Sequence, residues 1–401
     1  MRCSTYETPR MARRNMNMAG PASIRHANAL TCIHVLRTAI GALSISDVVQ
    51  RTGLSRPTVD SVMAAFEERN LVSAAASDAV TASGGRPARR FLFEANSSVV
   101  AGVDAGSRNI KVLIANLQGC ILGQAHRRIM ASISAVQRVD AVIETIRDAL
   151  AAADVPASKL RVACIGVPGI VGFDGRISNS YIVPEWNGTD VAKRIGAAFD
   201  CHAFLENDIN LAAFAEHHLG ASQLVENTLY LQVGNTISLS LTFNGKIHQG
   251  FHRSAGEVGS LRGMRWTGSS VDGLLSWTSA PTAVQVFDQA QSGDNVSLEE
   301  IKQLTRDIAP RIATISLAFD PDLIVVGGGL SRSGEFFVEL LREEIHRLIM
   351  IDAKPTLAAS ALGADGTTYG AVALVFHKSA TELFGMGDVP VPEISFSENR
   401  F

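Results

Sequence analysis

The sequence has no long hydrophobic run. Although 46% of its 401 residues are hydrophobic, no stretch approaches the roughly 18 apolar residues that a membrane-spanning helix needs. The N-terminal residues also lack the pattern of a secretory signal peptide. We therefore expect a cytoplasmic protein with no membrane partner, and the length predicts more than one domain.

Cysteine pairs are missing as well. The five cysteines are scattered and never spaced as C-x-x-C, which argues against a disulfide framework and a cysteine-rich zinc site; they are Cys3, Cys32, Cys120, Cys164 and Cys201. His217 and His218 are adjacent, so on a helix their side chains diverge by about 100° and cannot both face one ion. His248 and His252 have no accompanying carboxylate pattern. The sequence therefore predicts no metal site and no cofactor.

Lysine is absent from the first 95 residues. This segment has 12 arginines and 7 acidic residues, a net charge of +5, whereas the remainder carries −8 and the whole chain −3. A basic head joined to an acidic body suggests an anionic partner for the head. The alternative is a chance fluctuation of charge, so the positions of the arginines decide between the two.

The pattern of the head predicts three helices. Residues 1–22 show no periodicity, and we expect a disordered arm there. Apolar residues recur at helical spacing from 23 to 38, and a short second helix fits 46–51. A third helix begins after Ser55, a candidate N-cap, and carries one apolar stripe. Two helices joined by a Thr-Gly-Leu-Ser turn are typical of a helix-turn-helix, here within a domain of residues 23–95.

An arginine-rich hairpin follows the third helix. Residues 71–75 and 90–93 can pair around a loop, which predicts a winged helix-turn-helix. We expect the first turns of the third helix to enter the major groove of DNA and the wing to reach phosphates or the minor groove. The expected DNA contacts are Ser55, Arg56, Thr58, Ser61, Arg86, Arg89 and Arg90. The alternative is a three-helix protein-interaction module with solvated arginines.

From Ser98 onward, Val-rich strands alternate with helices, which indicates an α/β body. One strand ends in Asp104-Ala105-Gly106 and returns as a hairpin, an arrangement that suits a magnesium-bound phosphate. Another strand ends in Glu206-Asn207-Asp208, and a helix begins at once. Asp208 would there be ionised and exposed, in the position of a general base. The alternative is an aspartate that only caps the helix.

Two further segments add candidate site residues. Glu257 lies between glycines and supplies a carboxylate that can accept hydrogen bonds from adjacent hydroxyls. Residues 320–330 form a strand that runs into a triple glycine, which includes Gly327 and Gly328. Such glycines let the backbone approach a nucleotide, or they simply turn the chain tightly.

In order along the chain, these segments resemble the ROK family of repressors, open reading frames and kinases. The head resembles the winged helix-turn-helix of its repressor branch, of the N-acetylglucosamine and xylose repressor type. The resemblance implies an α/β body of two lobes of the actin/hexokinase-like (ribonuclease H-like) type, with a sugar in the cleft between them. The implied lobes are residues 96–205 and 206–380, and we expect residues 381–401 to be a loosely packed tail.

The resemblance also assigns roles to single residues. Asn207 and Asp208 match the family's sugar-binding and catalytic-base pair, and Glu257 matches its sugar-contacting glutamate. The nucleotide-binding positions of the family correspond to Asp104, Gly106, Gly234, Gly327 and Gly328.

The phosphate segments depart from the kinase pattern. Kinases follow the first Asp-x-Gly with a glycine and a threonine, where this chain has Ser107 and Arg108. Their second segment resembles G-T-G-I-G-G-G, whereas residues 234–240 read GNTISLS. Each added side chain obstructs the close backbone approach that phosphate binding requires. The nucleotide positions are therefore predicted to be vestigial, and we expect no enzyme activity.

The ligand and zinc segments depart as well. Ser260 stands where the family usually has a histidine, and residues 261–273 contain no cysteine or histidine, so the family's zinc knuckle cannot form. Val183 replaces an expected asparagine. The effector is therefore expected to differ from the usual hexose or to bind differently.

These observations together predict a DNA-binding transcriptional regulator, a repressor by type, whose kinase-like body senses a sugar or sugar derivative. Its partners would be a double-stranded DNA operator, the effector, and further copies of itself in a homodimer or larger homo-oligomer. Lobe closure would change the spacing of two heads on two half-sites. Two alternatives stay open: an ATP-dependent sugar kinase with a fused DNA-binding head, with Asp208 as base, and a scaffold with a vestigial cleft.

Overall fold

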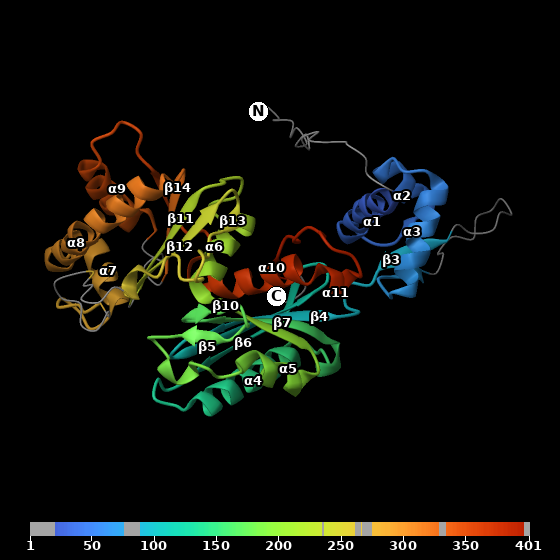
Figure 1. The fold of residues 1–401 in the computed structure, drawn as a ribbon, viewed down its shortest axis with the longest axis horizontal. Coiled ribbons are helices and arrows are strands. Elements are labelled where there is room, and N and C mark those ends of the chain that lie inside the picture. Colours follow the sequence, from blue (N-terminus) through green and yellow to red (C-terminus); the bar gives the residue numbers. More distant parts are fainter. Residues whose placement is uncertain are drawn as a thin grey trace. The chain divides into compact units, whose positions relative to one another are not determined.

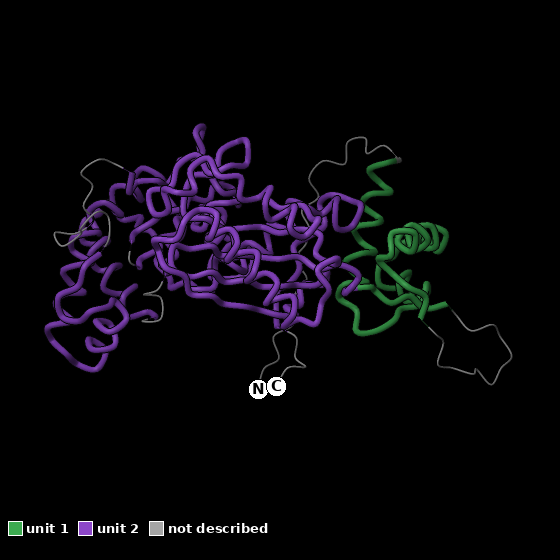
Figure 2. The backbone as a smooth tube through the Cα atoms, turned by 90° about the horizontal axis from the view of Figure 1, so that it is seen from below, with its two compact units in different colours: residues 1–94 green, residues 95–401 purple. Residues whose placement is uncertain are grey.

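A computed structural model describes residues 21–75, 89–234, 236–260, 266, 275–328 and 334–396. Contacts within the chain divide it into unit 1, residues 1–94, and unit 2, residues 95–401 (Figure 2). No helix among the described residues is long and apolar enough to cross a membrane. The expected disordered arm, residues 1–22, lies outside the described residues apart from its last two, which already belong to the first helix.

Unit 1 contains the three expected helices, which are α1 (Pro21–Arg37), α2 (Ile45–Thr52) and α3 (Arg56–Glu68). Ser44 and Asp47 form a capping box at the start of α2, and Gly53 ends it in the left-handed conformation, with φ of 71°. Ser55 caps α3 as predicted, because its hydroxyl accepts a hydrogen bond from the backbone N–H of Thr58. Local polar contacts at the helix ends therefore set the turn between α2 and α3.

The strands of unit 1 form a three-stranded antiparallel sheet in the order β1-β3-β2, with β1 (Leu43–Ser44), β2 (Val72–Ala75) and β3 (Arg90–Phe93). The predicted pairing of the two hairpin strands is confirmed, since Val72 lies opposite Phe93 and Ala75 opposite Arg90. The loop between these strands, residues 76–88, lies outside the described residues.

Unit 2 contains two sheets with the same internal order. The first runs β10-β7-β4-β5-β6-β16 and consists of β4 (Val99–Ala105), β5 (Asn109–Asn116), β6 (Cys120–Arg128), β7 (Leu160–Val167), β10 (His202–Asn207) and β16 (Ser395–Phe396). The second runs β13-β12-β11-β14-β15 and consists of β11 (Thr228–Val233), β12 (Ile237–Phe243), β13 (Lys246–Ile247), β14 (Leu323–Gly327) and β15 (Thr356–Ala359). In chain order, each sheet begins with three antiparallel strands, β4-β5-β6 in the first and β11-β12-β13 in the second. Parallel strands then follow beside the first strand of each meander, so unit 2 is a duplicated α/β fold. A separate hairpin pairs β8 (Ile170–Val171) with β9 (Ile177–Asn179).

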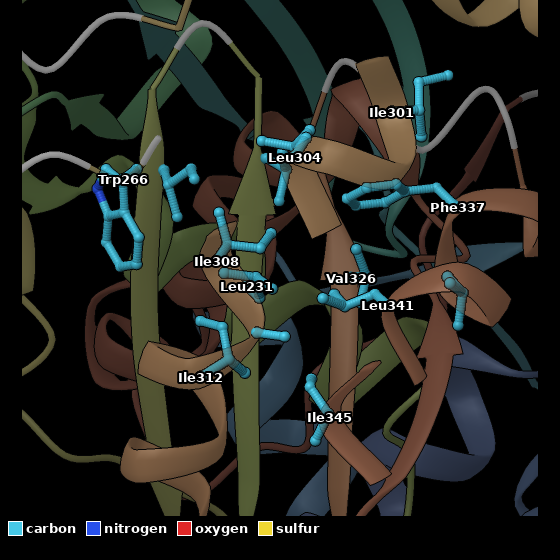
Figure 3. Close-up of a cluster of buried hydrophobic side chains, with 14 of the residues drawn as sticks. Leu231, Trp266, Ile301, Leu304, Ile308, Ile312, Val326, Phe337, Leu341 and Ile345 are labelled. Carbon is cyan, nitrogen blue, oxygen red and sulfur yellow. The ribbon is translucent and has the colours of Figure 1, made fainter. Parts of the chain in front are cut away.

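Helices cover both sheets (Figure 1). They are α4 (Ala135–Ala152), α5 (Val191–Phe199), α6 (Asp208–Leu219), α7 (Ala283–Gln291), α8 (Asn295–Phe319), α9 (Glu335–Leu348), α10 (Gly366–Lys378) and α11 (Ala380–Phe384). Single 3-10 turns lie at Ala157–Lys159, Pro184–Trp186, Val258–Ser260 and Gly363–Asp365. Aliphatic side chains from α8 and α9, among them Ile308, Ile312 and Leu341, bury the outer face of the second sheet (Figure 3). This close packing makes the second sheet rigid, so the residues at the ends of its strands are held in fixed positions.

The C-terminal part of the chain returns to the first sheet. A Cβ atom on Gly102 of β4 would lie 2.6 Å from Val372 on α10, so this helix lies directly on the first sheet, on the face opposite α4 (Figure 1). The expected division into lobes 96–205 and 206–380 is therefore corrected, because α10 belongs to the first lobe. Dividing the chain into lobes by residue number alone misses the return of α10 to the first sheet, because that return depends on long-range packing.

The expectation of a loosely packed tail from residue 381 is wrong for the residues that the structure describes. Val389 is 4% exposed, and β16 pairs in parallel with the start of β6. Gly119 lies against this segment, where a Cβ atom would be 2.4 Å from the carbonyl oxygen of Glu393. Edge-strand pairing and burial of isolated apolar residues therefore hold a segment whose composition looks like that of a linker.

Glycine allows α10 to touch α6. A Cβ atom on Gly370 would lie 1.9 Å from the carbonyl oxygen of Leu211 on α6. At the start of α10, the hydroxyl of Thr367 donates a hydrogen bond of 3.2 Å to the carbonyl oxygen of Asp208. The backbone at the start of α6 is thereby held between the two sheets.

We predict that Gly370→Ala lowers the free energy of unfolding by about 2–3 kcal/mol, because overpacking outweighs the usual gain of alanine in a helix. Gly366→Ala on the same helix is the matched control, since a Cβ atom there is 3.5 Å from the nearest atom, an ordinary contact. Urea denaturation of both variants measures the difference. Equal stabilities would contradict the proposed close contact.

Candidate functional site

The strand β10 and the helix α6 place the predicted pair Asn207 and Asp208. Asn207, rather than Asp208, is the N-cap of α6, and its Oδ1 accepts hydrogen bonds from the backbone N–H groups of Ile209 and Asn210, both at 3.0 Å. Its Nδ2 donates to the carbonyl oxygen of Gly169 at 3.0 Å. The Asn207 amide therefore holds the backbone of the site and keeps one N–H for a ligand.

Asp208 occupies the first turn of α6 and is only partly exposed. Burial, followed by the nearby charge of Asp104, raises its pKa from 3.8 to about 8, against the opposing effect of a backbone hydrogen bond from Ile209. The raised pKa and the half-buried position differ from the ionised, exposed state that the sequence predicts for Asp208. Desolvation by the surrounding structure outweighs the favourable helix N-terminus.

The structure brings three predicted carboxyl groups into electrostatic contact. Asp104 and Glu257 both raise the pKa of Asp208. Asp104 is itself affected, since burial raises its pKa to about 6, opposed by Lys111 and reinforced by Asp365. Burial also raises the pKa of Glu257. The ends of β4 and β10 and the segment after β13 therefore converge on one acidic site.

Glu257 lies in a segment that packs on β12. Gly256 has φ of +89°, and a Cβ atom on it would lie 2.4 Å from the carbonyl oxygen of Leu239, so only glycine fits there. Ser260, which replaces the family's histidine, donates its hydroxyl to the carbonyl oxygen of Glu257 at 2.7 Å. Ser260 is exposed and thus acts locally on the backbone. The zinc-knuckle positions after it lack cysteine and histidine and do not fit that metal.

The glycines of the two phosphate segments bond within the protein. The N–H of Gly106 donates to the carbonyl oxygen of Asn109 at 2.9 Å, and that of Gly234 donates to the carbonyl oxygen of Thr236 at 3.0 Å. Arg138, 1% exposed, donates to the carbonyl oxygens of Gly106 and Ser107 at 3.1 and 2.8 Å. These contacts brace the first segment from beneath.

Gly327 and Gly328 also have a packing role. A Cβ atom on Gly327 would lie 2.1 Å from the hydroxyl of Tyr230, a buried side chain. Gly328 has φ of +96° beside the carbonyl oxygen of Val233. Packing on Tyr230 therefore requires a glycine at position 327, and the positive φ favours a glycine at position 328.

The α3 residues predicted for DNA lie on one accessible side of unit 1. Ser55, Arg56 and Ser61 are exposed and Thr58 is half-buried, with its hydroxyl 2.8 Å from that of Ser55. The opposite stripe of α3, Val59, Met63 and Phe66, is buried. Arg56 is 68% exposed, and its Nε lies 3.9 Å from Asp60.

The wing arginines differ in their surroundings. Arg89 forms an ion pair with Glu67 of α3, and its guanidinium lies 5.0 Å from the ring centroid of Phe91. Arg90 is exposed. Arg86 lies outside the described residues. Arg89 therefore ties the base of the hairpin to α3.

One residue of the cleft was missed by sequence reasoning. Glu206 is 5% exposed and directly precedes Asn207, yet it was read only as part of a strand end. Its position before a predicted site pair was the one available signal. Its partners come from distant parts of the chain, which no local pattern reveals.

We predict that the melting temperature of D208N rises relative to that of the wild type as pH increases. The unfolded aspartate ionises near 3.8 and the folded one near 8, so wild-type stability falls progressively across that interval and levels off above it. The asparagine of D208N does not ionise, so the variant does not lose stability in this way as the pH rises. D140N is the control, because Asp140 is an exposed partner of Arg194. A D208N advantage that is constant from pH 5 to pH 9 would refute the raised pKa.

Comparison with known proteins gives three main similarities. The xylose repressor of Bacillus spizizenii is 22% identical over 359 residues, covering 84% of this chain and 91% of the repressor. The glucokinase of Thermotoga maritima is 23% identical over 309 residues, covering 68% of this chain and 96% of the kinase. A crystal structure of a ROK family transcriptional regulator, a homologue of the E. coli MLC protein, has a TM-score of 0.63 at 19% identity and covers 87% of this chain and 95% of its own. The ROK family profile matches residues 100–268 and 271–378, so the chain belongs to the ROK family.

Proposed function

We propose that this protein is a DNA-binding transcriptional regulator whose ROK body senses a sugar or sugar derivative. The observation that carries the proposal is the extent of the matches. The xylose repressor match covers 84% of the chain, more than residues 95–401 contain, so it extends into unit 1. The glucokinase match, at 68%, does not require unit 1.

The geometry of unit 1 supports a DNA-binding role as a winged helix-turn-helix. The α2–α3 turn is set by caps, α3 buries one stripe, and its first turns carry polar, exposed side chains. Arginine suits this surface, because its planar guanidinium can bind a guanine edge or a phosphate through two hydrogen bonds. In this proposal Ser55, Arg56, Thr58 and Ser61 face the major groove, and Arg86 and Arg90 contact the backbone beside it.

The geometry of the cleft supports a sugar effector. Asp208 and Glu257 offer carboxyl groups, and Asn207 retains one N–H, so the site supplies acceptors and a donor for a polyol. A hydroxyl that donates to Asp208 favours its ionised form, so binding releases a proton below about pH 8. Effector binding would close the lobes and change the spacing of two heads in a homodimer.

We predict that Arg56→Ala weakens binding to the DNA upstream of the chain's own gene by about 10- to 100-fold, because a base or phosphate contact of roughly 1–3 kcal/mol is lost. The triple variant of Arg86, Arg89 and Arg90 should bind more weakly still. Arg176→Ala, in unit 2 and paired with Asp190, is the matched control. Mobility-shift titrations at several salt concentrations measure both affinity and its salt dependence.

The wild type should lose affinity steeply as salt rises, by about 0.9 logarithmic units per phosphate contact for each tenfold increase. The DNA proposal fails if the Arg56 and wing variants bind as well as the wild type. In that case unit 1 would be a protein-interaction module.

A sugar kinase is the second candidate, favoured by the raised pKa of Asp208, which suits a general base, and by the glucokinase match. The phosphate segments weigh against it, since other side chains replace the glycines and threonines that kinases use to cradle phosphate, at residues 107, 108, 235, 236 and 238–240.

We predict no ADP release above background from MgATP with hexoses or amino sugars in a coupled assay. Clear turnover that Asp208→Asn abolishes would establish the kinase instead. A third candidate, a scaffold with a vestigial cleft, would show no thermal shift with any carbohydrate of a broad panel, whereas a bound effector raises the melting temperature.

A further inference from the structure

We propose that Glu206 is a positioning residue of the site. Its carboxylate ties segment 249–257, which includes Glu257, to the end of β10, directly before Asp208. The effect on ligand affinity rests on the proposed sugar-sensing function. The tie itself rests only on the contacts described below.

Glu206 is a buried carboxylate at the end of β10, with 5% of the residue exposed. Its Oε1 accepts the backbone N–H of Asn207 at 3.0 Å and Nδ2 of Asn210 at 3.4 Å. Asn210 in turn accepts the hydroxyl of Ser240 on β12 at 2.7 Å. One side of the carboxylate is therefore anchored to the backbone that presents Asp208.

The other contacts of Glu206 come from elements far away in the sequence. Gln249 donates its Nε2 to both carboxylate oxygens, each at 3.1 Å. Lys378, at the end of α10, lies 3.2 Å from Oε2, and Arg253 lies 3.8 Å from the same oxygen. The carboxylate thus joins β10 and α10 of the first lobe to the segment that follows β13 of the second.

Arg253 extends this tie to the β8–β9 hairpin. Its guanidinium lies 5.4 Å from the ring centroid of Phe173, which is on the turn of that hairpin and 80% exposed. Arg253 adopts φ of +58°, a left-handed conformation that costs a non-glycine residue free energy. Such a conformation persists only where surrounding contacts hold it, and the side chain of Arg253 has contacts with Glu206 and Phe173.

The segment is thereby held at two points. Gln249 and Arg253 are bound at Glu206, and Gly256 packs against the carbonyl oxygen of Leu239 on β12. Glu257 follows immediately after the second point. Removing the first point frees the segment between β13 and Gly256 and leaves Glu257 held from one side only, by the contact of Gly256 with Leu239.

The chain contains a matched control. Glu216, on the last turn of α6, is 1% exposed and accepts hydrogen bonds from the backbone N–H groups of Ala221, Ala361 and Leu362 and from the hydroxyl of Ser360. None of these partners lies in segment 249–257. E216Q therefore removes the charge of another buried, hydrogen-bonded carboxylate without touching the tie.

Hydrogen exchange of the full-length chain without ligand tests the tie. E206Q should raise amide exchange in residues 249–257 by at least tenfold, whereas E216Q should leave it within about twofold of the wild type, although both lower the melting temperature. The double variant E206Q/Q249E, which reverses the acid and the amide, should restore protection. Equal increases in E206Q and E216Q, or no increase in E206Q, would overturn the proposal.

Thermal shift with D-xylose, D-glucose and N-acetyl-D-glucosamine tests the positioning role. Whichever sugar stabilises the wild type should bind E206Q at least tenfold more weakly and E216Q with unchanged affinity. If E206Q exchanges faster but keeps the wild-type affinity, the positioning role is overturned. If no sugar shifts the wild type, the sugar-sensing function loses its support from this panel, while the exchange measurement still decides the tie.

Discussion

At Gly370 the backbone of α10 lies against the carbonyl oxygen of Leu211 on α6, closer than any side chain would permit. Helix α10 belongs to the lobe of the first sheet. Helix α6 begins at the end of that sheet and packs beside β12. The contact therefore joins the two halves of the duplicated fold through backbone rather than through adjustable side chains. Asp208 begins α6, so its place in the cleft depends on this contact.

Two acidic groups of the site, Asp104 and Asp208, are half-buried. Burial raises the pKa of Asp208 to about 8 and that of Asp104 to about 6, and the charge of Asp104 adds to the rise at Asp208. A site of this kind gains from any ligand that offers hydroxyl donors to the carboxylates. Such an arrangement does not by itself require phosphoryl transfer, and one fold can carry different functions.

Parts of this organisation follow from local patterns in the sequence. The N-cap at Ser55, the stop at Gly53 and the hairpin of β2 and β3 depend on neighbouring residues, and the structure has them where they are expected. The raised pKa of Asp208 and the long-range contacts of Glu206 do not. Both depend on burial and on partners more than a hundred residues away, such as Lys378 and Asp104. The packed segment after residue 381 was missed for the same reason.

The sequence by itself determined most element types, the basic head, the family and three carboxyl groups of the site, those of Asp104, Asp208 and Glu257. It could do so because caps, periodicity and motif order are short-range properties of the chain. Only the tertiary structure decided that α10 returns to the first sheet, that Asn207 braces the backbone, and that Gly327 accommodates Tyr230. These outcomes depend on which surfaces exclude water from one another, and that is a property of the folded chain as a whole.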